Sequence, residues 1–281
     1  MNSNILKKLH NSEIKILDEI KRVCAKNNLE YFLVGGTLLG AIRHKGFIPW
    51  DDDLDIAMPR EDYEKFLRIA PTCFENDFVL DDINENPNYW QVFAKVRLKK
   101  TNVEVSNVLE EYPGEKGIWV DIFPLDSVPN EKSPFFKLKG NVVQKLKSIY
   151  LMKSEYCLTK SKRLKMFVPI FAGVSMKKMN EIIKNIMISK NSPNNKFLVN
   201  YGSQYGIKKQ THLKEKYFPA IDVEFEGKMY KAPNDYDYVL RKIYGDNYMQ
   251  LPPMEKRVTH NPVKIKFEDG EEVVFDEATS N

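Results

Sequence analysis

Carboxylates at alternating positions dominate the segment 51–55 of this 281-residue chain. If the segment enters a β-strand, Asp53 and Asp55 lie on the same face, because residues i and i+2 of a strand point the same way. Leu54 and Ile56 then point into the core. Two negative charges at close range repel one another and are tolerated mainly when a cation lies between them. The pattern predicts a site for a hard, oxygen-ligated metal ion, and its alternatives are a polar strand edge or an acidic turn.

A glycine-rich turn precedes these acids. Gly35, Gly36 and Thr37 follow the apolar run 31–34 and open a short predicted helix. Glycines at such a place let the backbone approach a phosphate closely, and the free N–H groups and dipole of the helix start attract its charge. We therefore predict that these three residues cradle a phosphate, although glycines also form ordinary tight turns.

A third acid, Asp121, stands among apolar neighbours in the predicted strand 117–124. Taken alone, such an acid is more often an edge residue that faces water than a catalytic group. Together with the first two acids it could complete a three-carboxylate site for phosphoryl transfer, which needs charge neutralised on the transferred group and an in-line attack. Lys95 and Arg97 share one face of another predicted strand, where they could lie beside the acids or form a structural ion pair.

The elements that must position these residues alternate between helices and strands. Helical spacing of apolar residues predicts helices, and period-two alternation predicts strands. In the first half we expect helices over 4–28, 37–44 and 60–70, and strands over 31–34, 54–58, 90–98, 103–106 and 117–124. This order predicts an α+β (mixed α/β) fold with a core sheet and flanking helices.

The second half is predicted to be rich in helices and hairpins. We expect helices over 133–150 and 234–244, a basic helical stretch to about residue 190, and hairpins over 223–230 and 263–275. A soft boundary near residue 130 divides the chain into a catalytic core, 1–130, and a C-terminal region, 131–281, that completes the substrate site. The two parts could equally form one continuous domain.

Composition restricts the class of protein. A net charge of +4, with 42% hydrophobic and 29% charged residues, is typical of an ordinary soluble chain. A basic tract with interleaved aromatic residues is missing from the sequence, which argues against a nucleic-acid partner. The 3 widely spaced cysteines predict neither a disulfide framework nor a zinc site and fit a reducing cytoplasm. The N-terminus lacks the apolar run of a signal peptide.

The segment 34–56, which contains the glycine-rich turn and the acids, resembles the signature of the LicD family, which includes the fukutin-type proteins. The resemblance continues over 117–126, 223–228 and 244–253 and is weakest over 133–217. The turn and the three acids also resemble the nucleotidyltransferase fold of the DNA polymerase beta-like superfamily. This resemblance implies that Asp53, Asp55 and Asp121 hold Mg²⁺ or Mn²⁺, with Asp121 as a ligand or as the base for a sugar hydroxyl.

The same resemblance implies an enzyme that uses a CDP-alcohol donor carrying choline, ribitol or glycerol. It would transfer the phospho-alcohol to a sugar hydroxyl and release CMP. The implied acceptor is a lipopolysaccharide, teichoic acid or capsular glycan, or its lipid-linked precursor. We accordingly expect a cytoplasmic protein that can meet the inner face of the plasma membrane, with the basic stretch 160–190 as the contact. Gly35, Gly36 and Thr37 would hold the diphosphate, and the further candidates for donor binding are Arg43, Lys45, Trp50, Lys95 and Arg97.

Several roles stay open on the sequence. Arg43 could be a solvated cation at a helix end, and Trp50 could serve in packing alone. The protein could also be a conventional nucleotidyltransferase on a sugar phosphate or other small molecule, because spacing does not decide which phosphorus is attacked. A non-catalytic nucleotide-binding protein is the third possibility, and the intact acids argue against it.

Overall fold

A computed structural model of the chain describes residues 2–106, 108, 112–154, 166, 168–257 and 262–275. It begins with α1 (Ser3–Asn27), which is capped where the Asn2 side chain accepts a hydrogen bond from the Asn4 backbone N–H at 2.9 Å. Asn28 ends the helix in the left-handed region, with a φ of 52°. One face of α1 is apolar and buried, as the helical spacing predicted.

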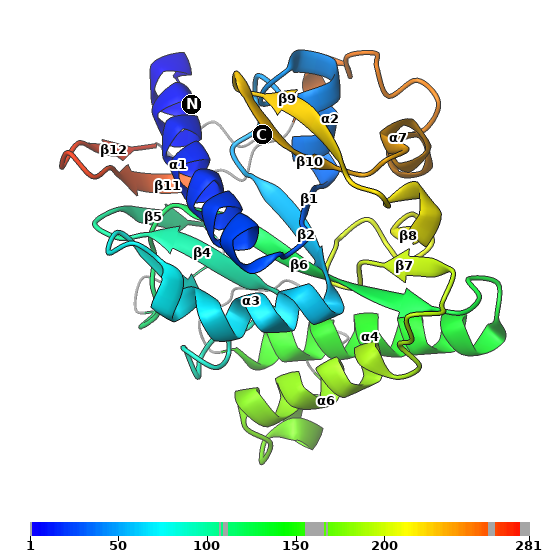
Figure 1. The fold of residues 1–281 in the computed structure, drawn as a ribbon. Helices are drawn as coiled ribbons and strands as arrows, with labels where there is room; N and C mark the ends of the chain where they lie inside the picture. Colours follow the sequence, from blue (N-terminus) through cyan, green and yellow to red (C-terminus); the bar gives the residue numbers. More distant parts are fainter. Residues whose placement is uncertain are drawn as a thin grey trace.

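The central sheet has the strand order β1–β2–β6–β4–β3 (Figure 1). β2 and β6 are parallel, and the other pairs along this path are antiparallel. Beyond the acids, β6 also pairs with β7, which pairs with β8. The mixed sheet with its flanking helices confirms the predicted α+β fold class. The bounds are β1 (Phe32–Leu33), β2 (Asp55–Pro59), β3 (Phe78–Asp81), β4 (Ala94–Leu98), β6 (Trp119–Val128), β7 (Phe197–Val199) and β8 (Thr211–Leu213).

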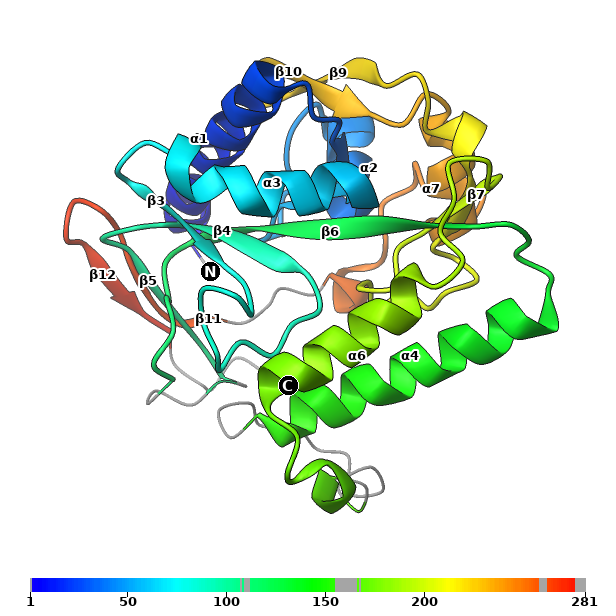
Figure 2. The same ribbon diagram turned by 60° about the horizontal axis from the view of Figure 1, so that its bottom comes forward.

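The two faces of the sheet differ in chemistry. Figure 2 shows α1 and α3 (Arg60–Cys73) on one side of the sheet, and α4 (Pro134–Lys153) and α6 (Met176–Ile188) on the other. The face toward α1 and α3 carries fully buried apolar side chains: Ile56, Ala94, Val96, Val120 and Ile122. Because successive residues of a strand point to opposite faces, Asp55, Lys95 and Asp121 lie on the other face.

A second apolar cluster lies between α4, α6 and β7. It includes one face of α6, on which Met179, Ile183 and Met187 are all buried. Val143 and Tyr150 of α4 are fully buried on the other side of the cluster. This cluster fastens the helical hairpin of the second half to the strand that carries Asp121.

Other parts of the second half return to the first. α2 (Gly35–His44) packs against β9 (Ile221–Phe225) and α7 (Tyr236–Tyr244). β9 and β10 (Lys228–Ala232) form the predicted hairpin, with Glu226 and Gly227 in the left-handed region at the turn. β11 (Pro262–Lys266) pairs with β12 (Glu272–Val274) and with β5 (Asn102–Val105). Short 3₁₀ turns are η1 (Val168–Phe171), η2 (Lys214–Lys216) and η3 (Met254–Lys256).

Strand prediction was wrong in places. The strand expected over 90–98 begins only at Ala94. Ahead of it, the Trp90 ring packs edge-on against Tyr112, with centroids 4.5 Å apart, so its alternation reflects packing outside the sheet. β3, β7 and β8 were not predicted, because strands of 3 or 4 residues contain too little of a periodic pattern.

The predicted membrane contact is not tested by the structure. Residues 160–165 and 167 of the basic stretch lie outside the described residues. Among the helices that are described, none is both long enough and apolar enough to cross a bilayer. Contact with a membrane surface stays a prediction.

Candidate functional site

Four strands align charged side chains in one row on the face opposite α1 and α3. The register places Asp55 of β2 opposite Asp121 of β6, Asp121 opposite Lys95 of β4, and Lys95 opposite Asp81 of β3. Lys95 Nζ forms an ion pair with Asp121. Asp53 lies two residues before the start of this row, in the segment that leads into β2. The structure therefore brings the three predicted acids together.

The first turn of α2 lies against these acids. A Cβ atom on Gly35 would lie 3.2 Å from Asp55 Oδ2, and one on Gly36 would lie 2.6 Å from Asp51 Oδ2. Gly35 also has a φ of 57°, which favours glycine. The Thr37 hydroxyl accepts a hydrogen bond from the Asp55 backbone N–H at 2.8 Å. The predicted phosphate turn and the acids thus form one unit, in which the glycines leave room for carboxylates at a helix N-terminus.

Negative charge accumulates in this unit. Burial raises the pKa of Asp55 well above its usual value, and the charges of Asp53, Asp121 and Asp51 raise it further. The pKa of Lys95 is lowered, because burial disfavours its charged form more than the neighbouring Asp121 favours it. A cluster with this excess of negative charge is stabilised by a cation.

The donor set fits a hard divalent cation. Asp53, Asp55 and Asp121 offer carboxylate oxygens, which are ligands that Mg²⁺ prefers in proteins. Within the described ranges, no three His, Cys, Asp or Glu side chains already have the arrangement of a finished metal site. Asp121 forms an ion pair with Lys95 through its Oδ1 atom. The metal role of the three acids stays a prediction.

The acid cluster should make the stability of the metal-free protein depend on pH. Burial first, and neighbouring acids second, raise the pKa of Asp55 and Glu13 above their ordinary values of 3.8 and 4.5. The folded chain then keeps protons that the unfolded chain has released, so the free energy of unfolding falls as pH rises toward the raised pKa values. Because Mg²⁺ would compensate the carboxylates, we expect a smaller fall in MgCl₂ than in EDTA. Urea unfolding from about pH 5 to about pH 8 measures both slopes, and equal slopes would contradict this expectation.

Three of the predicted donor-binding residues have contacts outside the acid row. Arg43 Nη1 donates a hydrogen bond to the Tyr248 carbonyl oxygen at 2.9 Å, which fastens the C-terminal part of the chain to α2. Lys45 is exposed and ends α2 with a φ of 58°. The Arg257 guanidinium lies 4.4 Å from the centroid of the half-buried Trp50 ring. A role in donor binding stays a prediction for Arg43, Lys45 and Trp50.

Lys95 and Arg97 lie on one strand face but have different partners. Arg97 Nε donates a hydrogen bond to Asp81 Oδ2 at 2.6 Å, and its Nη1 donates to the Gly117 carbonyl oxygen at 2.9 Å. This is the structural ion pair that the sequence left open as an alternative. Lys95 instead lies beside the acids, with its Nζ 4.4 Å from the centroid of the Trp119 ring. Of the two cations, Lys95 is therefore the one placed to meet a substrate at the acids.

His10 and Glu13 of α1 lie next to the segment 51–55, and neither was predicted from the sequence as a site residue. Glu13 is only 2% exposed. His10 Nε2 lies 2.8 Å from the Asp51 carbonyl oxygen, and its ring stacks on Phe47 with centroids 3.7 Å apart. A signal for Glu13 was present in the sequence, because its position falls on the otherwise apolar face of α1. A charged side chain on a buried helix face indicates a specific partner.

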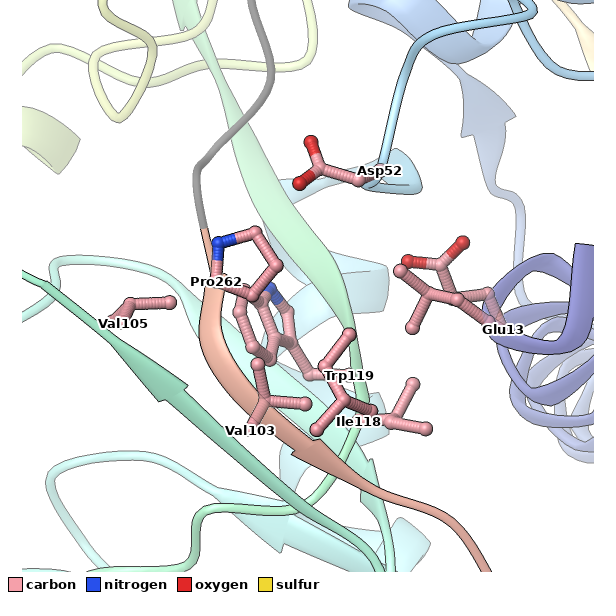
Figure 3. A pocket seen from close by; sticks show the side chains of 9 residues that line it. Glu13, Asp52, Val103, Val105, Ile118, Trp119 and Pro262 are labelled. Carbon is pink, nitrogen blue, oxygen red and sulfur yellow. The ribbon is translucent and has the colours of Figure 1, made fainter. Parts of the chain in front are cut away.

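Two pockets lie near the acid row without including it. Figure 3 shows the smaller one, where the carboxylates of Glu13 and Asp52 lie at the edge of the same space, above the Trp119 ring in this view. The larger is partly open to solvent and lies between α3, α6 and the loop after β3. The residues that line them do not include Asp53, Asp55 or Asp121.

The chain is similar to known proteins over most of its length. Residues 28–156 match the family described as "LicD/FKTN/FKRP, nucleotidyltransferase domain". Over 257 residues, 88% of this chain and 92% of the relative, the chain is 30% identical to the lipopolysaccharide cholinephosphotransferase LicD of Haemophilus influenzae. It is also 46% identical over 57 residues to an uncharacterized protein of Rickettsia typhi, which covers 20% of this chain and 18% of that protein.

Proposed function

The chain belongs to the LicD family, and we propose that it is a phosphotransferase that modifies a glycan of the lipopolysaccharide kind. The support from sequence is the 30% identity, spread over 88% of the chain, to a cholinephosphotransferase. The structural observation that carries the proposal is the position of Asp55, directly opposite Asp121 and beside the first turn of α2. Carboxylates that can hold a divalent cation, next to N–H groups that can hold a phosphate, suit phosphoryl transfer.

In the finer form of this proposal, the donor is a CDP-alcohol carrying choline, ribitol or glycerol. The acceptor is a sugar hydroxyl of a cell-surface glycan or of its lipid-linked precursor. The first turn of α2 binds the diphosphate through its free N–H groups. Asp53, Asp55 and Asp121 hold Mg²⁺ or Mn²⁺, which when bound neutralises charge on the transferred phosphoryl group and on the leaving CMP.

We assign to Asp121 the role of the base that accepts the proton of the acceptor hydroxyl. The acceptor hydroxyl must lose its proton as its oxygen bonds to phosphorus, and a carboxylate within reach can take it. The new O–P bond forms, the bond from phosphorus to the CMP oxygen breaks, and CMP leaves with the electron pair. The Lys95 ammonium forms an ion pair with this carboxylate and so lies beside the proposed site of proton transfer.

Release of CMP is the measurement that tests the proposed function. The purified chain is incubated with MgCl₂, with CDP-choline, CDP-ribitol or CDP-glycerol in turn, and with lipopolysaccharide or lipid-linked oligosaccharide. We expect CMP release with one donor and its loss in EDTA and in the Asp53→Ala variant. No release with any pair, or release that survives Asp53→Ala, would contradict the proposal. Pyrophosphate release from a nucleoside triphosphate would instead support a conventional nucleotidyltransferase.

A further inference from the structure

Glu13 and Glu19 are both buried on α1, but their carboxylates differ in hydrogen bonding. Glu19, 5% exposed, accepts hydrogen bonds from Arg22 at 2.7 Å and from the Glu75 backbone N–H at 2.8 Å. Glu13 is 2% exposed, and its Oε2 has no hydrogen-bond partner in the described part of the chain. A buried carboxylate oxygen without a hydrogen-bond partner is costly to the fold, so such an atom indicates a ligand that is bound in the working protein.

The surroundings of Glu13 narrow the chemistry of that ligand. Four acids of the segment 51–55 act on Glu13, and Asp53 has the largest effect, followed by Asp52. Together with burial, these charges raise the pKa of Glu13 well above its usual value. Figure 3 shows the Glu13 and Asp52 carboxylates at the edge of one small pocket. A space bordered by two carboxylates, with further acids in the same segment, suits a cation and repels an anion.

The position of α1 explains how Glu13 reaches the acids. α1 packs across β4 and β6 on the face opposite the charged row. His10, one turn before Glu13, lies 2.8 Å from the Asp51 carbonyl oxygen through its Nε2. This contact holds α1 against the segment that leads into β2, and Glu13 borders one pocket with Asp52 of that segment.

We propose that Glu13 is a further carboxylate of the cation site, supplied by α1, which contacts the cation held by Asp53 directly or through one bound water. This proposal rests on the metal-dependent function proposed above. Mg²⁺ is commonly held by one or two protein carboxylates and keeps several waters, so a carboxylate next to the first ligands strengthens binding without a change in the chemical step.

Manganese titration tests the proposal without reference to activity. Free Mn²⁺ is followed by electron paramagnetic resonance as it is added to the full chain and to the Glu13→Gln, Glu19→Gln and Asp53→Asn variants. We expect the Mn²⁺ dissociation constant of E13Q to rise by about tenfold or more. E19Q, the matched control, removes a buried carboxylate of the same helix and should bind as the unmodified chain does.

Thermal unfolding in EDTA separates folding from binding. E13Q should unfold at or above the temperature of the unmodified chain, because a neutral amide replaces a carboxylate among acids. MgCl₂ should raise its unfolding temperature less than that of the unmodified chain. The Glu13→Asp variant, which keeps the charge on a shorter side chain, should retain more of the affinity than E13Q.

The possible outcomes separate this proposal from the proposed function. Mn²⁺ affinity unchanged in E13Q but lost in D53N would overturn the role of Glu13 and leave the metal-dependent function standing. An equal loss in E13Q and E19Q would also overturn it, since the cause would then be a general disturbance of α1. If the unmodified chain binds no Mn²⁺, both the role of Glu13 and the metal-dependent function are overturned.

Discussion

Replacing Asp55 with asparagine is expected to lower the rate of phosphotransfer by about a thousandfold or more and to stabilise the metal-free protein. Asp55 lies opposite Asp121, and Asp53 is the neighbouring acid whose charge acts on it most strongly. Loss of Asp55 removes one of the proposed cation ligands. The same neighbours make its charge unfavourable in the folded chain. An amide of the same shape relieves that repulsion, while the Thr37 contact to the residue 55 backbone is kept.

The two effects are measured separately. CMP release in MgCl₂ gives the loss of rate, and urea unfolding in EDTA gives the change in the free energy of unfolding. Asp77→Asn serves as the control, because the Asp77 side chain is 45% exposed and its ion-pair distance to Lys15 is a long 3.6 Å. A D55N variant that keeps a tenth of the activity, or that is less stable than the unmodified chain in EDTA, would contradict the assignment.

Replacing Asp126 with alanine is expected to lower the free energy of unfolding by about 3–5 kcal/mol. The Arg60 guanidinium donates to both Asp126 oxygens, at 2.9 Å and 2.7 Å. Asn191 Nδ2 donates to the same carboxylate at 2.7 Å. The Asp126 side chain is 0% exposed and that of Arg60 is 11% exposed. Removal of Asp126 therefore leaves the largely buried guanidinium with only its 3.2 Å contact to Glu64 as an ion pair among the described residues.

A double replacement distinguishes this cause from a packing defect. Arg60→Met combined with Asp126→Leu removes both charges, and such apolar replacements of a buried ion pair are often close to neutral in stability. Urea unfolding of the two single variants and of the double variant measures the coupling between the residues. A double variant as unstable as D126A would show that the ion pair is not the source of the loss.

The ion pair also bears on the site, because Asp126 and Asp121 belong to the same strand. Arg60 begins α3, and Asn191 follows α6, so the pair holds helices from both sides of the sheet to β6. We therefore assign Arg60 and Asp126 a structural role that supports the site, and we assign them no part in the reaction.

Much of the site could be predicted from short-range pattern. The alternation of acids and aliphatic residues before and within β2 predicted that Asp53 and Asp55 act on one another, and the electrostatics agree. The glycines before Thr37 predicted a turn into a helix, and α2 begins at Gly35. Such features follow from the sterics of neighbouring residues, which act in any context.

Long-range partners were harder to predict, and Glu13 shows why. Its place on the apolar face of α1 was visible in the sequence, but that face spans several turns and could pack against any strand. The same holds for Lys95 and Arg97, which share a face and were left with two possible roles. Only the packing of the whole sheet determines that Lys95 pairs with Asp121 and Arg97 pairs with Asp81.

The sequence by itself determined which residues can do chemistry here and which of them are local neighbours: the turn 35–37, the acids of 51–55, and an isolated acid at Asp121. Tertiary structure alone decided that Asp55 and Asp121 face one another across parallel strands, and that Glu13 of α1 borders one pocket with Asp52. The physical reason is that strand register depends on the packing of side chains far apart in the chain. The backbone preferences of neighbouring residues do not determine which distant strands pair. A turn or an alternation within a strand, in contrast, depends only on its own few residues.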